Sequence, residues 1–151
     1  MAEAVKLSAA LIVTNQFEYH PYLNQTLLIE ECHRLDVSVT AYCGMAVGHV
    51  FEDSVLQEIA KAHGRSVAQV VLRWLLQQGV IALSRTVSPE HVIGNIQVFD
   101  FVLASTEVAA IHGLAEAERR IVNPQGLSPQ WDPTLAAEGL TSRQRYAPVG
   151  S

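Results

Sequence analysis

The sequence predicts a single α/β domain built on a parallel sheet. Three short and mostly continuous apolar segments, over residues 11–16, 37–42 and 80–84, alternate with segments of helical periodicity. Strands of this kind, separated by helices, are typical of parallel sheets with both faces covered. With 151 residues, of which 49% are hydrophobic, the chain is long enough for one such domain.

Local signals set the elements in order. Ser66 and Gln69 have the spacing of a capping box, and Gly64 and Gly79 follow the ends of two helical segments. Asn24 is a suitable cap for the helix that follows the first strand. The predicted elements, in chain order, are a helix over 2–10, a strand over 11–16, a helix over 25–35, a strand over 37–42, a loop around Gly44 and Gly48, helices over 54–63 and 66–78, a strand over 80–84, and helices over 89–98 and 106–118.

Polar residues mark the carboxyl ends of all three predicted strands. They are Asn15 and Gln16, then Tyr42 and Cys43, and finally Arg85 and Thr86. In parallel α/β architectures the site lies outside the carboxyl ends of the strands. We therefore expect the functional site at this edge of the sheet.

The segment after the third strand is typical of a phosphate-binding site. Ser88, Pro89 and Glu90 have the residue types preferred at a helix start, with Ser88 as the N-cap. A helix N-terminus presents free N–H groups and the positive end of a dipole. Together with the basic side chain of Arg85 and the nearby hydroxyls, this predicts a phosphorylated cofactor or substrate.

Composition excludes some partners. The net charge of −5 argues against non-specific binding of nucleic acid or of a membrane surface. Cys32 and Cys43 have neither metal-ligand nor redox-motif spacing, which indicates reduced thiols in the cytoplasm. No apolar run approaches the length of a membrane span, and the histidines suggest no metal site, so we expect a soluble, unprocessed chain.

Several ordered motifs resemble segments of the aldo-keto reductases. The resemblance runs nearly continuously from about residue 2 to residue 132. This part of the chain is similar to the C-terminal half of proteins in the bacterial 2,5-diketo-gluconate reductase-like branch. The segments that carry it are 15–23 (NQFEYHPYL), 39–42 (VTAY), 63–74 (HGRSVAQVVLRW), 83–95 (LSRTVSPEHVIGN) and 121–132 (IVNPQGLSPQWD). On this basis residues 1–132 form the half-barrel, and residues 133–151 are a weakly patterned tail.

The resemblance implies a partial (β/α)8 TIM barrel, with about three C-terminal βα units, a terminal helix and a loop. It also implies carbonyl reduction with NADPH, or with NADH as the alternative cofactor. A whole barrel needs about 250 residues, so the chain resembles only the C-terminal half of one. The resemblance places the family's catalytic tetrad of Asp, Tyr, Lys and His in the first half of the barrel. We therefore expect no catalytic residue in this chain.

At the nicotinamide end, the resemblance assigns roles to residues after the first two strands. Gln16 matches the glutamine that binds the carboxamide, and Tyr42 matches the tyrosine that stacks on the ring. Cys43 and Met45 stand in the family's pyrophosphate-binding turn, where Cys43 replaces Ser and Gly44 replaces Pro. Trp131 resembles an aromatic residue that walls the substrate pocket.

At the adenosine end, Arg85 matches the basic residue that meets the 2′-phosphate. Thr86 and Ser88 are hydroxyl donors to the same group, and Val87 packs beside the ribose. Asn95 matches the adenine-binding asparagine. His91 replaces an arginine, and a neutral imidazole offers neither a permanent charge nor a bidentate fork. This substitution predicts a weakened preference for NADPH over NADH.

Two functional hypotheses follow. The first is the cofactor-binding half of an NADP(H)-dependent oxidoreductase, which would reduce a small carbonyl substrate only when completed by a catalytic half. The second is a non-catalytic half-barrel whose open strand edges lead it to self-associate as a homo-oligomer or to bind a partner.

Overall fold

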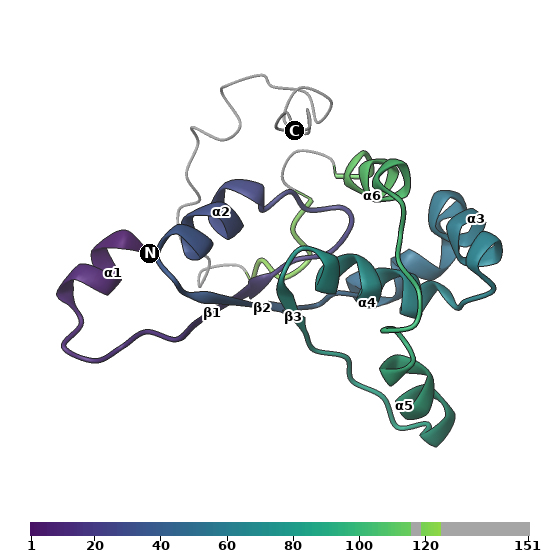
Figure 1. The fold of residues 1–151 in the computed structure, drawn as a ribbon, viewed down its shortest axis with the longest axis horizontal. Coiled ribbons are helices and arrows are strands. Elements are labelled where there is room, and N and C mark those ends of the chain that lie inside the picture. Colours follow the sequence, from purple (N-terminus) through teal and green to yellow (C-terminus); the bar gives the residue numbers. More distant parts are fainter. Residues whose placement is uncertain (116–118, 125–151) are drawn as a thin grey trace.

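The computed structural model describes residues 1–115 and 119–124, which form a three-stranded parallel sheet flanked by helices (Figure 1). The strand order is β1-β2-β3, and both pairings are parallel. This confirms the predicted α/β class. The elements are α1 (Ala2–Leu7), β1 (Thr14–Glu18), α2 (Thr26–Arg34), β2 (Ser38–Tyr42), the 3₁₀ segment η1 (Ala46–Glu52), α3 (Ser54–His63), α4 (Val67–Gln77), β3 (Val80–Ala82), α5 (Pro89–Ile96) and α6 (Ser105–His112).

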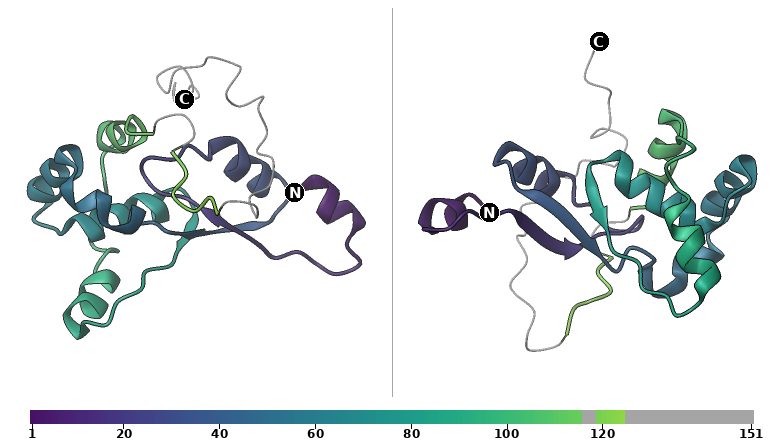
Figure 2. Two further views of the ribbon diagram at one scale, coloured as in Figure 1. Left: turned by 180° about the vertical axis from the view of Figure 1, so that it is seen from behind. Right: turned by 60° about the horizontal axis from the view of Figure 1, so that its bottom comes forward.

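The two faces of the sheet differ within the described residues, because the helices pack mainly on one of them. Phe17, Val39 and Val80 are buried on one face, in the same core as residues of α2 and α4. On the other face, Gln16 lies opposite Thr40, which lies opposite Ile81, and both Gln16 and Ile81 are exposed. Within the described residues the helices therefore leave this second face largely open (Figure 2).

The core lies between the covered face and the helices. α4 contributes most to it: Val70, Trp74 and Leu75 are almost completely buried, and the rings of Tyr19 and Trp74 lie 4.9 Å apart. The predicted capping box of Ser66 and Gln69 is present at the start of α4. Burial of large aromatic and aliphatic side chains is the main favourable contribution to folding here.

Several predicted boundaries need correction. β1 begins at Thr14 and runs to Glu18, so residues 11–13 lie outside it and Gln16 lies within the strand instead of at its carboxyl end. β3 ends at Ala82 instead of residue 84, α5 ends at Ile96, and α6 spans Ser105–His112 instead of 106–118. Ser88 is the N-cap of α5 as predicted, but its side chain makes no capping hydrogen bond.

Two predictions concern residues outside the described part of the chain. They are the end of the half-barrel at residue 132 and the tail over residues 133–151.

Candidate functional site

The carboxyl edge of the sheet is formed by the paired ends of β1 and β2. Glu18 lies opposite Tyr42 in the register, and Gln16 lies opposite Thr40 one step earlier on the same face. Tyr42 is half-buried and Gln16 is exposed. Because residues two apart in a strand share a face, Gln16, Glu18, Thr40 and Tyr42 all belong to the open face of the sheet.

The turn after β2 has a strained backbone. Cys43, Ala46 and Val47 have φ values of 58°, 47° and 49°, in the left-handed region that L-residues avoid. Gly48 follows with φ of 102°. Such strain tends to gather at functional sites. Burial raises the pKa of the Cys43 thiol, so this cysteine is held as the neutral thiol at neutral pH.

Residues 84–95 form a second group, on the loop after β3 and the start of α5. The hydroxyl oxygen of Thr86 accepts a hydrogen bond from the backbone N–H of Ser88 at 3.1 Å. Asn95 Nδ2 donates to Ser84 Oγ at 3.0 Å and so ties α5 back to the loop. Arg85 and His91 are exposed. This group presents a guanidinium, hydroxyls and the first-turn N–H groups of a helix on one segment of chain.

Gln16 lies within β1 and Tyr42 is the last residue of β2, whereas Cys43 and Met45 follow β2 and residues 84–95 follow β3. Among the described residues, no hydrogen bond joins one group to the other. Val87 is 93% exposed and packs on nothing described. Trp131 lies outside the described residues.

Sequence reasoning missed a buried polar cluster at the end of β1. Glu18 and His20 are 1% and 0% exposed, and Glu18 Oε1 lies 3.0 Å from His20 Nε2. Backbone N–H groups of Ile121 and Val122 also donate to the Glu18 carboxylate, at 2.7 Å and 3.1 Å. The signal for the cluster is the Glu-x-His spacing at a strand end, which places both side chains on one side of the chain.

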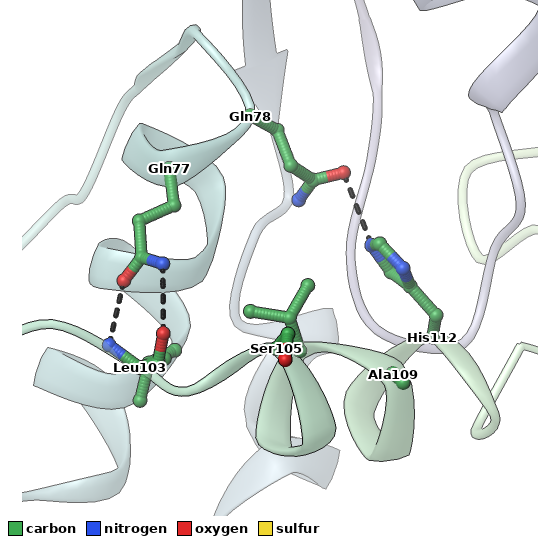
Figure 3. A pocket seen from close by; sticks show the side chains of 7 residues that line it. Gln77, Gln78, Leu103, Ser105, Ala109 and His112 are labelled. Carbon is green, nitrogen blue, oxygen red and sulfur yellow. Dashed lines mark hydrogen bonds between the residues drawn. The ribbon is translucent and has the colours of Figure 1, made fainter. Parts of the chain in front are cut away.

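A hollow of about 420 Å³ lies in the outer helical layer, between the C-terminal end of α4 and α6 (Figure 3). The side-chain amide of Gln77 donates to the backbone oxygen of Leu103 and accepts from the backbone N–H of the same residue. Gln78 Oε1 accepts from Tyr19 Oη at 2.6 Å and lies 3.2 Å from His112 Nε2. Burial lowers the pKa of His112 to about 4. Its polar groups are engaged within the fold and it lies behind the covered face, so this hollow is not the site predicted at the strand ends.

A smaller hollow of about 210 Å³ lies closer to the carboxyl edge. It is lined by Tyr22, His49, Glu52, Asp53 and Arg119. Tyr22 Oη donates to Asp53 Oδ2 at 3.1 Å, and burial together with this carboxylate raises the pKa of Tyr22. The pair of Tyr22 and Asp53 has a structural role, because Asp53 is also the N-cap of α3.

Residues 1–115 and 119–124 contain neither a cluster of metal ligands nor a membrane-spanning helix. No group of three or more His, Cys, Asp or Glu side chains in these ranges could hold a metal ion. None of the helices described there is long and apolar enough to cross a membrane.

Comparison with known proteins places the chain in a family. Residues 1–116 match the model of the aldo/keto reductase family, and the chain belongs to that family. Curated relatives include an aldo-keto reductase of Mycobacterium sp. (strain MCS), 34% identical over 125 residues, which cover 83% of this chain and 44% of the relative. Glyoxal reductase of Bacillus subtilis (strain 168) is 34% identical over 127 residues, which cover 84% of this chain and 46% of the relative.

Solved structures agree with this assignment. A structure assigned as a 2,5-diketo-D-gluconic acid reductase B has a TM-score of 0.82 and 51% identity, covering 87% of this chain and 47% of that one. A Gox0644 mutant in complex with NADPH has a TM-score of 0.75 and 31% identity, covering 79% of this chain and 44% of that one. The chain thus spans less than half the length of the relatives it matches. The fold resembles part of an aldo-keto reductase barrel.

Proposed function

We propose that this chain supplies the NADPH-binding half of an aldo-keto reductase and does not reduce carbonyls alone. The observation that carries the proposal is the group on residues 84–95, where an exposed guanidinium, hydroxyls and a helix N-terminus follow the last strand. These are the donors that a phosphate monoester needs. The match to the family over residues 1–116 and the NADPH-bound neighbour support the choice of cofactor.

The residues present suit NADPH in charge and in hydrogen-bonding groups. At the adenosine end, Arg85 supplies a permanent positive charge, and Thr86 and Ser88 supply hydroxyls beside it. Asn95, held by Ser84, presents an amide for the adenine, and Val87 offers an apolar contact for the ribose. His91 contributes to this end only weakly, so the proposed site discriminates less between NADPH and NADH than a site with a second arginine.

At the nicotinamide end, the open face of the sheet presents Gln16 and Tyr42. An amide side chain suits the carboxamide, and a half-buried aromatic ring gives a flat surface for stacking. Cys43 and Met45 border the strained turn, where the pyrophosphate would lie. The bound cofactor would supply the hydride, and Trp131 is the proposed wall of the substrate pocket.

The proposal that the chain lacks turnover rests on the family's tetrad, for which this sequence has no matching motif. The test is to mix the purified chain with NADPH and a panel of small aldehydes and ketones, and to follow nicotinamide absorbance. We expect cofactor binding by fluorescence but no carbonyl-dependent oxidation. Carbonyl-dependent oxidation by the chain alone, above a heat-denatured control, would overturn this part of the proposal.

A second candidate function is that of a half-barrel that self-associates. The observation that favours it is α5, which has no buried residue and carries Val92, Ile93 and Ile96 at 47%, 61% and 65% exposure. Ile81 and Leu83 add apolar surface near the outer edge of the sheet. Such a surface favours association in water. Sedimentation at several concentrations distinguishes the two candidates, since a monomer that binds NADPH supports the first one alone.

A further inference from the structure

The carboxylate of Glu18 joins the end of β1 to residues 119–124, the last segment that the structure describes. It is 1% exposed and accepts hydrogen bonds from the backbone N–H groups of Ile121 at 2.7 Å and Val122 at 3.1 Å. These partners are more than a hundred residues away in sequence. Bonds to an ionised acceptor are roughly twice as strong as neutral ones, and a buried carboxylate left without donors is costly.

His20 does not replace these backbone donors. The N–H of Tyr22 lies 3.3 Å from His20 Nδ1 and can only donate, so Nδ1 accepts and the ring proton of the neutral imidazole lies on Nε2. Nε2–H then donates to Glu18 Oε1 at 3.0 Å. Burial lowers the pKa of His20 and opposes its protonation, although Glu18 favours the charged form. Glu18 thus depends on Ile121 and Val122 to complete its hydrogen bonding.

A second contact fixes the same segment. The guanidinium carbon of Arg119 lies 5.0 Å from the centre of the Tyr22 ring, within the range of a cation–π interaction. Tyr22 is in turn bonded to Asp53 at the start of α3. Residues 119–122 are therefore attached both to the end of β1 and, through Tyr22, to the segment after β2.

The anchored segment lies beside the proposed cofactor site. Glu18 is paired in register with Tyr42 and lies two residues after Gln16 on the same face. We propose that Glu18 is a positioning residue, which anchors residues 119–124 as a wall at the nicotinamide end of the site. The role of this segment as a wall of the cofactor site rests on the proposed function. The anchoring of the segment by Glu18 does not depend on it.

The anchoring is tested by residue-resolved amide exchange on the Glu18→Gln chain. Oε1 of Glu18 accepts from both Ile121 and His20, whereas Oε2 accepts from Val122 alone. The amide of Glu18→Gln should therefore keep its oxygen at the Oε1 position and place its NH2 group, which cannot accept, against the Val122 N–H. We expect protection of the Val122 amide to fall by about tenfold to a hundredfold, the range for one bond to a charged acceptor. Protection of the Val39 amide in β2 should stay unchanged, whereas a general loss of structure would lower both.

Two further variants complete this test. Glu31→Gln is the matched control, because Glu31 pairs with Arg34 on an exposed part of α2 and should leave both amides unchanged. Val122→Pro removes one donor without touching the sheet, and should speed exchange of the Ile121 amide. Wild-type protection at Val122 in Glu18→Gln, or unchanged exchange at Ile121 in Val122→Pro, would refute the anchor.

The wall is tested by cofactor titration of the same Glu18→Gln chain. NADPH and NADH share the nicotinamide end, so the Kd of both should rise by the same factor, whereas Arg85→Ala should raise the Kd of NADPH alone. Lost protection with both Kd values unchanged would show that the anchored segment is no wall of the site. If the wild-type chain binds neither cofactor, the proposed function fails while the exchange result still decides the anchor.

Discussion

His112 should make the stability of the fold depend on pH. Its imidazole is 8% exposed, stands edge-on to Trp74 with ring centres 5.6 Å apart, and lies 3.2 Å from Gln78 Oε1. Gln78 Nε2 donates to the backbone oxygen of Trp74, which fixes the orientation of the amide, so the neutral imidazole donates through Nε2. A proton added to this ring would place a charge among apolar groups.

The magnitude follows from the pKa. Burial lowers the pKa of His112 from 6.5 to about 4, so the folded state binds fewer protons than the unfolded state between these values. The stabilisation is fully present above pH 6.5 and is lost progressively as the pH falls toward 4. The full difference corresponds to a ceiling of about 3 kcal/mol, and we expect about 2 kcal/mol because the ring lines an open hollow.

The assay is urea unfolding at about pH 7.5 and about pH 4.5. His112→Gln keeps a hydrogen-bond donor but does not titrate, so its free energy of unfolding should fall by about 2 kcal/mol less than that of the wild type between these conditions. Loss of the ring contact with Trp74 lowers the free energy of unfolding of His112→Gln by the same amount at both pH values, so it does not affect this comparison. His33→Gln, at an exposed position, is the control and should follow the wild type. Parallel losses in the wild type and His112→Gln would refute the reasoning.

The other predictions concern the carboxyl edge. Arg85→Ala should weaken NADPH binding by about tenfold to a hundredfold and leave NADH binding unchanged, since one charge-assisted contact to the 2′-phosphate is lost; equal losses for both cofactors in a fluorescence titration would contradict that role. Val47→Asn should raise the free energy of unfolding by about 0.5–1 kcal/mol, because Asn tolerates the left-handed backbone and Val47 is 72% exposed; a loss of stability in urea unfolding would show that the valine packs usefully. Cys43 should react with a thiol reagent at neutral pH more slowly than free cysteine, because burial raises its pKa; reaction at the rate of the unfolded chain would argue against this environment.

The sequence predicted the alternation of strands and helices well, because that depends on local signals. The capping box of Ser66 and Gln69 and the stop at Gly64 each involve residues a few positions apart, and all are present. The prediction failed where packing decides. In β1 the polar residues Gln16 and Glu18 flank the buried Phe17, which signals two different faces, but the apolar residues 11–13 drew the predicted strand toward the N-terminus.

The candidate site was only partly predictable, for a similar reason. Residue types and motif order indicated the two groups at the strand ends. The cluster at Glu18 depends on backbone donors more than a hundred residues away, and no local pattern encodes such a contact. The strain at Val47 likewise arises from closing the turn after β2, which a β-branched residue does not suggest.

The most direct test of the central claim is a titration of the purified wild-type chain with NADPH and with NADH. Quenching of protein fluorescence and the change in nicotinamide emission are followed together, with the oligomeric mass measured on the same sample. We expect saturable binding of NADPH, with a modest preference over NADH because His91 stands where the family has arginine. A folded chain that binds neither cofactor would contradict the proposed function, and its family motifs would then serve only to maintain the fold.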